Sequence, residues 1–387
     1  MVAAERSPYR AFAGIFAATL FTLMAVGAVL PVLPHYVKGP LDYGSLAVGF
    51  AIGAFAFTAL ASRPVAGHLA DARGRRPVVA VGALLAAVAG ALYFVPAGLP
   101  GLIVARLVLG AGEGTVFTAG ATWVVDLAPQ DRRARVIGLY GLAVWGGLSL
   151  GPLIGSALFN AAHFDAVWAF CAISPAIGAL IALLVPDPFQ PTESSRRRQI
   201  IVRESVRPGA ALALATVGYA AMASFIVLDL NSKHIGHGAA AFAAFATTVV
   251  ITRAIGGDLP DRLGPVRCAT GAAVISAIGL ALIALAHSLA LALAGAVGMG
   301  LAFALIYPSL SLVVVNSVAD SKRGSALGTF TAFFDIGFAI GGPLTGLAAS
   351  LGGYSAAFWV GSACALGAVA VASSLRRMLT LQAAASG

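Results

Sequence analysis

The sequence predicts an all-α integral membrane protein, with twelve transmembrane helices arranged as two pseudo-symmetric bundles of six. Three observations carry this prediction: an apolar composition, apolar runs of membrane length, and an internal repeat. Of the 387 residues, 59% are hydrophobic and only 10% are charged, whereas soluble domains carry about 25% charged residues. The composition therefore indicates a chain that is dissolved in lipid.

The apolar runs follow one another along the whole chain at close to the length that a bilayer requires, about 20 residues for each helix. They contain the Gly and Pro residues that membrane helices tolerate, because neighbouring helices satisfy the freed backbone groups. The runs predict spans at residues 11–33, 45–66, 77–96, 101–125, 135–159, 166–185, 209–230, 238–256, 267–286, 289–314, 325–350 and 355–374.

The internal repeat is clearest in the segment GHLADARGRR, residues 67–76, which returns in modified form as GDLPDRLGPVR, residues 257–267. Five residues recur at a constant offset of 190: Gly67 and Gly257, Leu69 and Leu259, Asp71 and Asp261, Gly74 and Gly264, and the preceding Arg63 and Arg253. Both copies lie between long apolar runs. We therefore expect a duplicated membrane protein with one copy in each half.

The longest polar segment separates the two predicted halves, residues 1–186 and 209–387. This segment, residues 187–208, contains prolines, serines and a run of arginines. Such a composition is typical of a linker rather than a folded domain. A basic, lipid-contacting helix over residues 196–207 is the alternative.

The basic residues are distributed unequally between the two predicted sides of the membrane. Of the 24 Lys and Arg residues, twenty-one lie in loops on the side of the termini, Arg63 and Arg253 among them; Lys38 and Lys233 lie opposite, and Arg106 lies within a span. Positive residues accumulate on the cytoplasmic side. The sequence therefore predicts a multi-pass inner-membrane protein with both termini in the cytoplasm. Topology, with attraction to anionic lipid, explains the net charge of +9 without nucleic acid.

A chain of twelve spans with the motif G-x-L-x-D-x-x-G-R-R between spans two and three resembles the major facilitator superfamily of secondary transporters, and its 12-helix drug/proton antiporter-like branch. The resemblance covers nearly the whole chain and implies the major facilitator fold. It also implies a cytoplasmic gate in which Asp71 and Arg75 act with an acid at the end of span four, the place of Asp126. That the motif only sets the topology is the alternative.

The residues of this motif support a gate on physical grounds as well. Gly67 and Gly74 permit tight turns and close approach of helices. Asp71 can cap a helix or pair with nearby arginines in one transport state. The second copy retains the acid as Asp261 but lacks two arginines, so we expect an asymmetric gate carried mainly by the first half.

Span four contains two charges, Arg106 and Glu113, on one helix face about 10 Å apart along the axis. Glu113 is predicted to lie close to the middle of the bilayer, where a charge usually marks an ion path or relay. Arg106 and Gly110 match the motif R-x-x-x-G, which the resemblance links to proton coupling in antiporters. We expect Glu113 to bind the proton and Arg106 to return it to its ionised form; a buried structural pair is the alternative.

Spans five and eleven share the pattern G-x-x-x-G-P-x-x-G or its last part. The residues concerned are Gly147, Gly151, Pro152 and Gly155 in span five, and Gly342, Pro343 and Gly346 in span eleven. Small residues at this spacing allow two helices to meet closely, and proline permits a bend. The resemblance links the span-five form to exporters, and generic close packing is the alternative.

One further acid, Asp335, is predicted near the middle of span eleven, where it could bind a proton or a cation. A structural acid that stays protonated is the alternative. Asp229, near the outer end of span seven, is expected to be solvated. The aromatic residues considered as substrate contacts are Tyr140, Trp145, Phe225, Tyr307, Phe333 and Phe334, although packing is the common role of such residues.

Taken together, these features predict a secondary active transporter that exports small amphiphilic compounds in exchange for protons by alternating access. An importer or facilitator of sugars or small metabolites would share the fold. A non-transporting membrane enzyme or sensor is the third alternative, but the sequence offers no nucleophile and base pair. We expect no enzymatic activity, metal or cofactor, the proton gradient as energy source, and a monomer whose partners are its substrate, protons and lipid.

Overall fold

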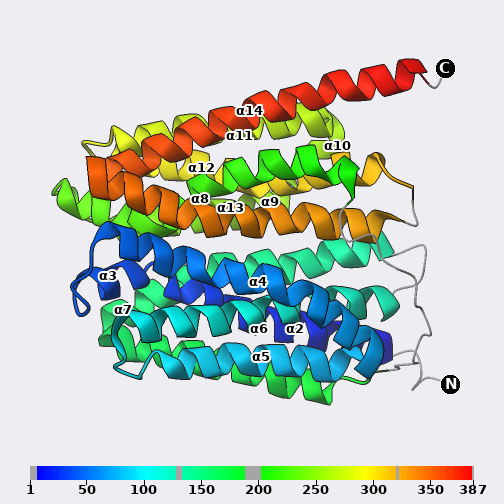
Figure 1. The fold of residues 1–387 in the computed structure, drawn as a ribbon, viewed down its shortest axis with the longest axis horizontal. Coiled ribbons are helices and arrows are strands. Elements are labelled where there is room, and N and C mark those ends of the chain that lie inside the picture. Colours follow the sequence, from blue (N-terminus) through cyan, green and yellow to red (C-terminus); the bar gives the residue numbers. More distant parts are fainter. Residues whose placement is uncertain (1–6, 128–132, 188–201, 320–321, 386–387) are drawn as a thin grey trace. The chain divides into compact units, whose positions relative to one another are not determined.

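The computed structural model describes residues 7–127, 133–187, 202–319 and 322–385, and within these ranges all regular elements are helices (Figure 1). The first half contains α2 (Ser7–Val29), α3 (Leu33–Lys38), α4 (Ser45–Arg73), α5 (Arg75–Leu92), α6 (Gly98–Leu127) and α7 (Arg133–Leu184). The second half contains the 3₁₀ turn η2 (Arg203–Ser205), α8 (Val206–Ser232), α9 (Gly238–Gly256), α10 (Leu259–Leu263), α11 (Pro265–Ala284), α12 (Leu289–Asn316), α13 (Arg323–Gly352) and α14 (Tyr354–Ala385).

Eleven helices in the described ranges are long and apolar enough to cross a membrane. One of them, residues Leu139–Leu184, has 46 residues, which at about 1.5 Å per residue is roughly twice the thickness of a bilayer. Its backbone leaves the helical conformation at Ala162 and His163. Divided at this kink, α7 supplies two spans, and the expected all-helical architecture of twelve spans is confirmed.

The chain forms two compact units. The first comprises Met1–Leu41 and Ala54–Ser195, and the second comprises Asp42–Gly53 and Arg196–Gly387. Helix α4 therefore contributes residues to both units. Most of the predicted linker, residues 188–201, lies outside the described residues, and α8 begins at Val206, before the predicted end of the linker.

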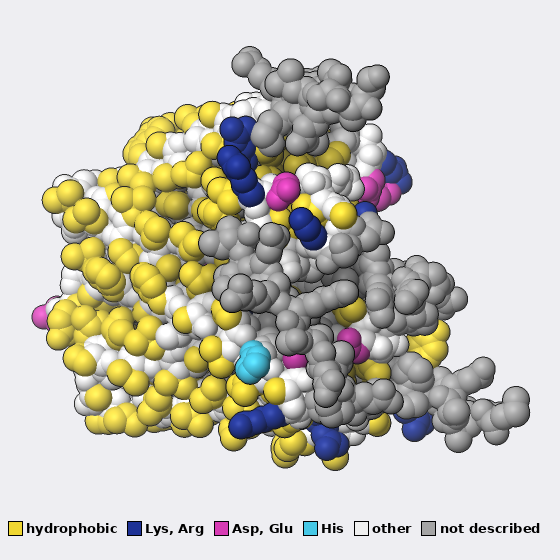
Figure 2. Space-filling model, turned by 45° about the vertical axis from the view of Figure 1, so that its right-hand side comes forward, with side chains coloured by type: hydrophobic (Ala, Val, Ile, Leu, Met, Phe, Trp, Pro, Cys, Tyr) yellow, Lys and Arg dark blue, Asp and Glu magenta, His cyan; other side chains and the backbone are white. Residues whose placement is uncertain are grey.

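Hydrophobic side chains cover much of the described part of the face shown in Figure 2. Leu184, Ile255 and Leu351 are each about four-fifths exposed. In water such surfaces would cause association, whereas in a bilayer they face lipid chains. This surface confirms an integral, multi-pass membrane protein.

The structure reproduces the internal repeat at a pair of helix crossings. In the first unit, a Cβ atom at Gly110 of α6 would overlap with the carbonyl oxygen of Phe55 in α4. In the second unit, a Cβ atom at Gly300 of α12 would lie 2.7 Å from the carbonyl oxygen of Phe245 in α9. Gly110 and Gly300 are separated by 190 residues, and so are Phe55 and Phe245. The same close crossing is therefore built twice.

The glycines of the repeated G-P-x-x-G pattern also lie at close helix contacts, as expected. Cβ atoms at Gly151 and Gly155 of α7 would overlap with backbone atoms of Met24 and Ala28 in α2. In the second unit, Gly342 and Gly346 of α13 pack instead against the first residues of α4: a Cβ atom at Gly346 would lie 2.9 Å from the carbonyl oxygen of Ser45. Pro152 and Pro343 lie inside their helices. The two copies of the pattern thus serve different helix pairs.

The predicted loop at residues 67–76 is largely helical, which corrects the expected ends of spans two and three. Helix α4 continues to Arg73, and the only break before α5 is Gly74, with φ 95° and ψ 160°. In the second half Gly264 has a similar conformation, with φ 87° and ψ 133°. These positive φ values favour glycine. The prediction of a turn at Gly67 is wrong, because Gly67 lies within α4.

Candidate functional site

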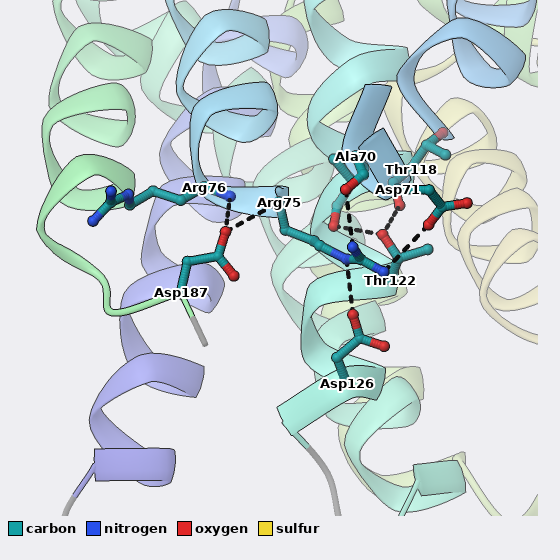
Figure 3. A network of polar contacts seen from close by, with 9 residues as sticks. Ala70, Asp71, Arg75, Arg76, Thr118, Thr122, Asp126 and Asp187 are labelled. Carbon is teal, nitrogen blue, oxygen red and sulfur yellow. Dashed lines mark hydrogen bonds and ion pairs between the residues drawn. The ribbon is translucent and has the colours of Figure 1, made fainter. Parts of the chain in front are cut away.

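The first copy of the repeated segment forms a polar network around Arg75 (Figure 3). The Nη1 atom of Arg75 donates a 2.9 Å hydrogen bond to the carbonyl oxygen of Ala70, and Nη2 lies 3.2 Å from Oδ1 of Asp71. Its Nε atom lies 2.8 Å from Oδ2 of Asp126, the penultimate residue of α6. The structure thus brings together Asp71, Arg75 and Asp126, which we call the latch residues.

Exposure differs among the latch residues. The Arg75 side chain is 12% exposed, whereas the side chains of Asp71 and Asp126 are 31% and 48% exposed. Solvent therefore weakens each ion pair individually. Because one planar guanidinium serves both acids and a helix carbonyl, the group nevertheless fixes how the ends of α4 and α6 lie relative to the start of α5.

A third acid, Asp187, joins this network from the segment that follows α7, three residues beyond the end of that helix at Leu184. Its Oδ2 atom accepts 2.9 Å hydrogen bonds from the backbone N–H groups of both Arg75 and Arg76 (Figure 3). These N–H groups belong to the first turn of α5, where the helix itself offers no acceptors. Gly67, in contrast, has only the Thr118 methyl group within contact distance of a Cβ position, at 3.9 Å.

The second copy lacks this arrangement. Pro265 occupies the position of Arg75, and Asp261 is exposed. In this segment Arg262 forms an ion pair with Asp258 at 2.5 Å, with side chains that are 71% and 53% exposed. Asp261 therefore has an environment unlike that of Asp71.

A buried ion pair lies farther inside the first unit. Glu113, near the middle of the 30-residue α6, has an Oε2 atom 3.8 Å from Nη2 of Arg63 in α4. The two side chains are only 9% and 12% exposed. The guanidinium carbon of Arg63 also lies 4.4 Å from the centre of the Phe117 ring, a geometry that stabilises a cation.

This position of Arg63 corrects its assignment to a loop. It lies within α4, ten residues before the end at Arg73, or about 15 Å along the helix axis. The sequence contained one signal, since Arg63 recurs as Arg253 in the repeat. Arg253 is likewise inside a helix, α9, and its Nε and Nη2 atoms are shielded from solvent.

The hydroxyl group of Tyr140 lies beside this ion pair. It accepts a 3.3 Å hydrogen bond from Thr19 of α2 and lies 3.2 Å from the carbonyl oxygens of Val116 and Phe117 in α6. It is also within electrostatic reach of Glu113 and Arg63. Tyr140 of α7 is 3% exposed. Its hydroxyl group links α7 to α2 and α6.

Arg106 is fully buried. Its guanidinium carbon lies 4.8 Å from the centre of the Phe55 ring, and its charge is close to the side chains of Tyr93 and Cys171. These groups come from α4, from the residue that follows α5, and from α7. The structure therefore surrounds Arg106 with aromatic and weakly polar groups, while Arg63 lies beside Glu113.

Asp335 lies in the first half of α13 and is 3% exposed. Its sequence neighbour Phe334 contacts Phe303, with ring centres 6.3 Å apart. Tyr219 joins the same group, with its ring centre 4.5 Å from that of Phe303 and 5.3 Å from that of Phe338. Helix α13 thus contributes both this buried acid and two members of a large aromatic group, Phe334 and Phe338.

The other aromatic candidates divide into distinct environments. Phe225 is fully buried and stacks on Tyr354 at 5.9 Å, and Trp145 is 8% exposed. Phe333 packs against Gly209, where a Cβ atom would overlap with its ring. Tyr307 shares a 2.8 Å hydrogen bond with Thr331 of α13.

Asp229 is not the solvated residue that the sequence suggested, because it is 1% exposed. Its Oδ2 atom accepts a 2.8 Å hydrogen bond from Nζ of Lys233, and its Oδ1 atom accepts a 2.9 Å bond from Ser355 of α14. The Lys233 ammonium group also donates to the carbonyl oxygens of Ile283 and Ala284. This cluster joins the ends of α8, α11 and α14.

Comparison with known proteins places this architecture in a family. The family model described as Major Facilitator Superfamily matches residues 15–230 and 209–378. An uncharacterized MFS-type transporter of Salmonella typhimurium is 32% identical over 372 residues, which cover 94% of this chain and 96% of that protein. An uncharacterized MFS-type transporter of Burkholderia mallei is 33% identical over 386 residues, which cover 95% and 94% of the two chains.

Solved structures have the same fold at low sequence identity. A variant of the nucleoside transporter NupG matches with a TM-score of 0.78 and 14% identity, covering 94% of this chain and 99% of that one. The human organic anion transporter MFSD10 (TETRAN) matches with a TM-score of 0.73 and 18% identity, with the same coverage. From the family model, the relatives and the fold, the chain belongs to the major facilitator superfamily of membrane transporters.

Proposed function

We propose that this protein is a secondary active transporter that exports small amphiphilic compounds in exchange for protons, by alternating access across the cytoplasmic membrane. The observation that carries the proposal is the buried pair of Glu113 and Arg63, whose charged atoms are 3.8 Å apart. Charged residues within a span are costly and usually serve an ion or substrate path.

Glu113 is the proton acceptor in this proposal, and Arg63 rather than Arg106 is the cation that restores its ionised form. The pair is neutral overall when Glu113 is ionised. A proton on Glu113 leaves the charge of Arg63 uncompensated, which favours a state with more water around the pair. A polar or cationic group of the substrate competes with the proton for the same carboxylate, and this competition couples the two fluxes.

Asp335 is the second proton-binding group in the proposal. The aromatic surface of Tyr219, Phe303, Phe334 and Phe338 beside it supplies the apolar contacts that an amphiphilic substrate requires. The latch residues Asp71, Arg75 and Asp126 hold the cytoplasmic ends of α4, α5 and α6 in one transport state and release them in the other.

The test is transport by the purified protein in proteoliposomes. A thermal-stability screen of antibiotics, sugars and metabolites at two pH values first identifies a ligand. Glu113→Gln should then reduce transport driven by a pH gradient at least about tenfold, equivalent to ~1.4 kcal/mol in the coupled step. If Glu113→Gln and Asp335→Asn both keep gradient-driven transport, the assignment of the coupling residues is wrong.

Two further variants separate coupling from folding. Glu113→Gln leaves a buried arginine without its carboxylate, which destabilises proteins, so the double variant Arg63→Gln with Glu113→Gln removes both charges together. It should fold and exchange substrate down its gradient without responding to pH. Asp165→Asn, at an exposed acid of α7, is the matched control and should retain full activity. Transport into everted vesicles against the substrate gradient distinguishes an exporter from an importer.

A further inference from the structure

Asp187 occupies an unusual position at the start of α5. The residue that precedes this helix is Gly74, which has no side chain to bind the first N–H groups. Serine, threonine, aspartate or asparagine normally does this from within the same segment. Here the carboxylate comes from a residue separated by 112 positions from Arg75. The cap therefore also ties the end of α7 to the start of α5.

The capped residue is the centre of the latch. The Arg75 backbone binds Asp187, while its side chain reaches Ala70 and Asp71 of α4 and Asp126 of α6 (Figure 3). Through this one residue the ends of four helices are connected. A flexible arginine side chain meets two separate acids only if its backbone is held at a fixed place and orientation.

The second half offers an internal contrast. The position that corresponds to Arg75 is Pro265, which has no backbone N–H group to donate. A carboxylate therefore cannot accept hydrogen bonds from two successive backbone N–H groups starting at that position. The first half therefore has both the carboxylate cap and the arginine that binds Asp71 and Asp126. The equivalent position in the second half has neither.

We propose that Asp187 is a positioning residue of the latch: by holding the first turn of α5, it directs the Arg75 side chain to Asp71 and Asp126. The role of these contacts in transport rests on the proposed function. The contacts themselves can be tested without a substrate, so the two proposals can fail separately.

Hydrogen–deuterium exchange tests the cap directly in the purified full-length protein. Asp187→Asn should increase exchange at the Arg75 and Arg76 amides about tenfold, since exchange reports local opening. Asp187→Glu, which keeps the charge, should restore part of the protection. The start of α11 and the control Asp165→Asn should show no change. Unchanged exchange at Arg75 and Arg76 in Asp187→Asn would overturn the proposal.

A second measurement distinguishes positioning from general stabilisation. Asp126→Asn should lower the thermal midpoint of the wild-type protein, because it removes a partner of Arg75. In the Asp187→Asn background the same change should lower the midpoint by less than about half as much, because contacting residues in one network are not additive. A fully additive effect would show that Asp187 stabilises α5 without positioning Arg75, and would overturn the proposal even if gradient-driven transport is established.

Discussion

The two halves of the molecule share two backbone features but only part of their charge pattern. Gly74 and Gly110 of the first half correspond to Gly264 and Gly300 of the second, and each pair has the same backbone role. Asp71 and Arg63 recur as Asp261 and Arg253, but three other charged positions have diverged. Arg75 corresponds to Pro265, Glu113 to Phe303 and Asp126 to Asn316. Steric requirements of the fold therefore persist in both copies, whereas the ionic network is specific to the first.

The largest expected effect tests the shared steric requirement at the two helix crossings. Gly110→Ala should destabilise the protein by about 3 kcal/mol, because its Cβ atom would overlap with the backbone of Phe55 and force α4 and α6 apart. Gly300→Ala should cost less, about 1–2 kcal/mol, because the corresponding contact with Phe245 is less close. Thermal unfolding in detergent measures both. Equal midpoints for the two variants would contradict the difference in packing.

The next largest effect is expected where the charged residues of the two repeat copies differ. Arg75→Gln should lower stability by about 2 kcal/mol, because it removes the shared partner of Asp71, Asp126 and Ala70. Arg262→Gln in the second copy should cost less than about 0.5 kcal/mol, because its pair with Asp258 is mainly exposed. The same unfolding assay applies, and transport should fall only in Arg75→Gln. A larger effect from Arg262→Gln would reverse the assignment of the latch to the first half.

A smaller and symmetric effect is expected at the two glycines with positive φ. Gly74→Ala and Gly264→Ala should each cost about 1 kcal/mol, since alanine is strained at φ 95° and at φ 87°. Nothing lies within 4 Å of a Cβ atom at Gly264, so its cost comes from the backbone alone. Unfolding midpoints that differ widely between the two variants would indicate that the two breaks are not equivalent.

The smallest effect distinguishes the continuous helix of the first copy from the broken one of the second. Gly67→Ala should raise stability by about 0.5 kcal/mol, because alanine favours a helix interior and the Cβ position is open. Gly257→Ala should bring no gain, because Gly257 lies between α9 and α10 and its Cβ atom would be 3.1 Å from the Arg253 carbonyl oxygen. A loss of stability in Gly67→Ala would argue against a continuous α4.

The sequence predicted the features that depend on composition and spacing along the chain. Apolar runs identified the spans, and the constant offset of 190 identified Gly74 and Gly264 as equivalent positions, which have similar φ values in the structure. Asp71, Arg75 and Asp126 were also expected to act together, and the structure brings them into contact.

The features that the sequence did not predict depend on contacts between separate helices. Arg63 was counted with the loop residues on the side of the termini, but the structure places it within α4, beside Glu113 of α6. Asp187 was assigned to the linker because it begins the longest polar segment, whose prolines, serines and arginines are typical of a linker. Asp229 was expected to be solvated because it lies near the outer end of span seven, but it is buried and one of its partners, Ser355, comes from α14. Each of these partners lies too far away in sequence for local patterns to reveal.

The most direct test of the central claim, that Glu113 of the first half exchanges a proton for substrate, is ligand-induced proton release from the purified protein. A pH-sensitive dye in weakly buffered solution records the protons released when the ligand identified by the stability screen is added. The wild type and the exposed control Asp258→Asn should release protons, and Glu113→Gln should release less than about half as many, because competition for one carboxylate links the two ligands. Equal release from Glu113→Gln and the wild type would contradict the account.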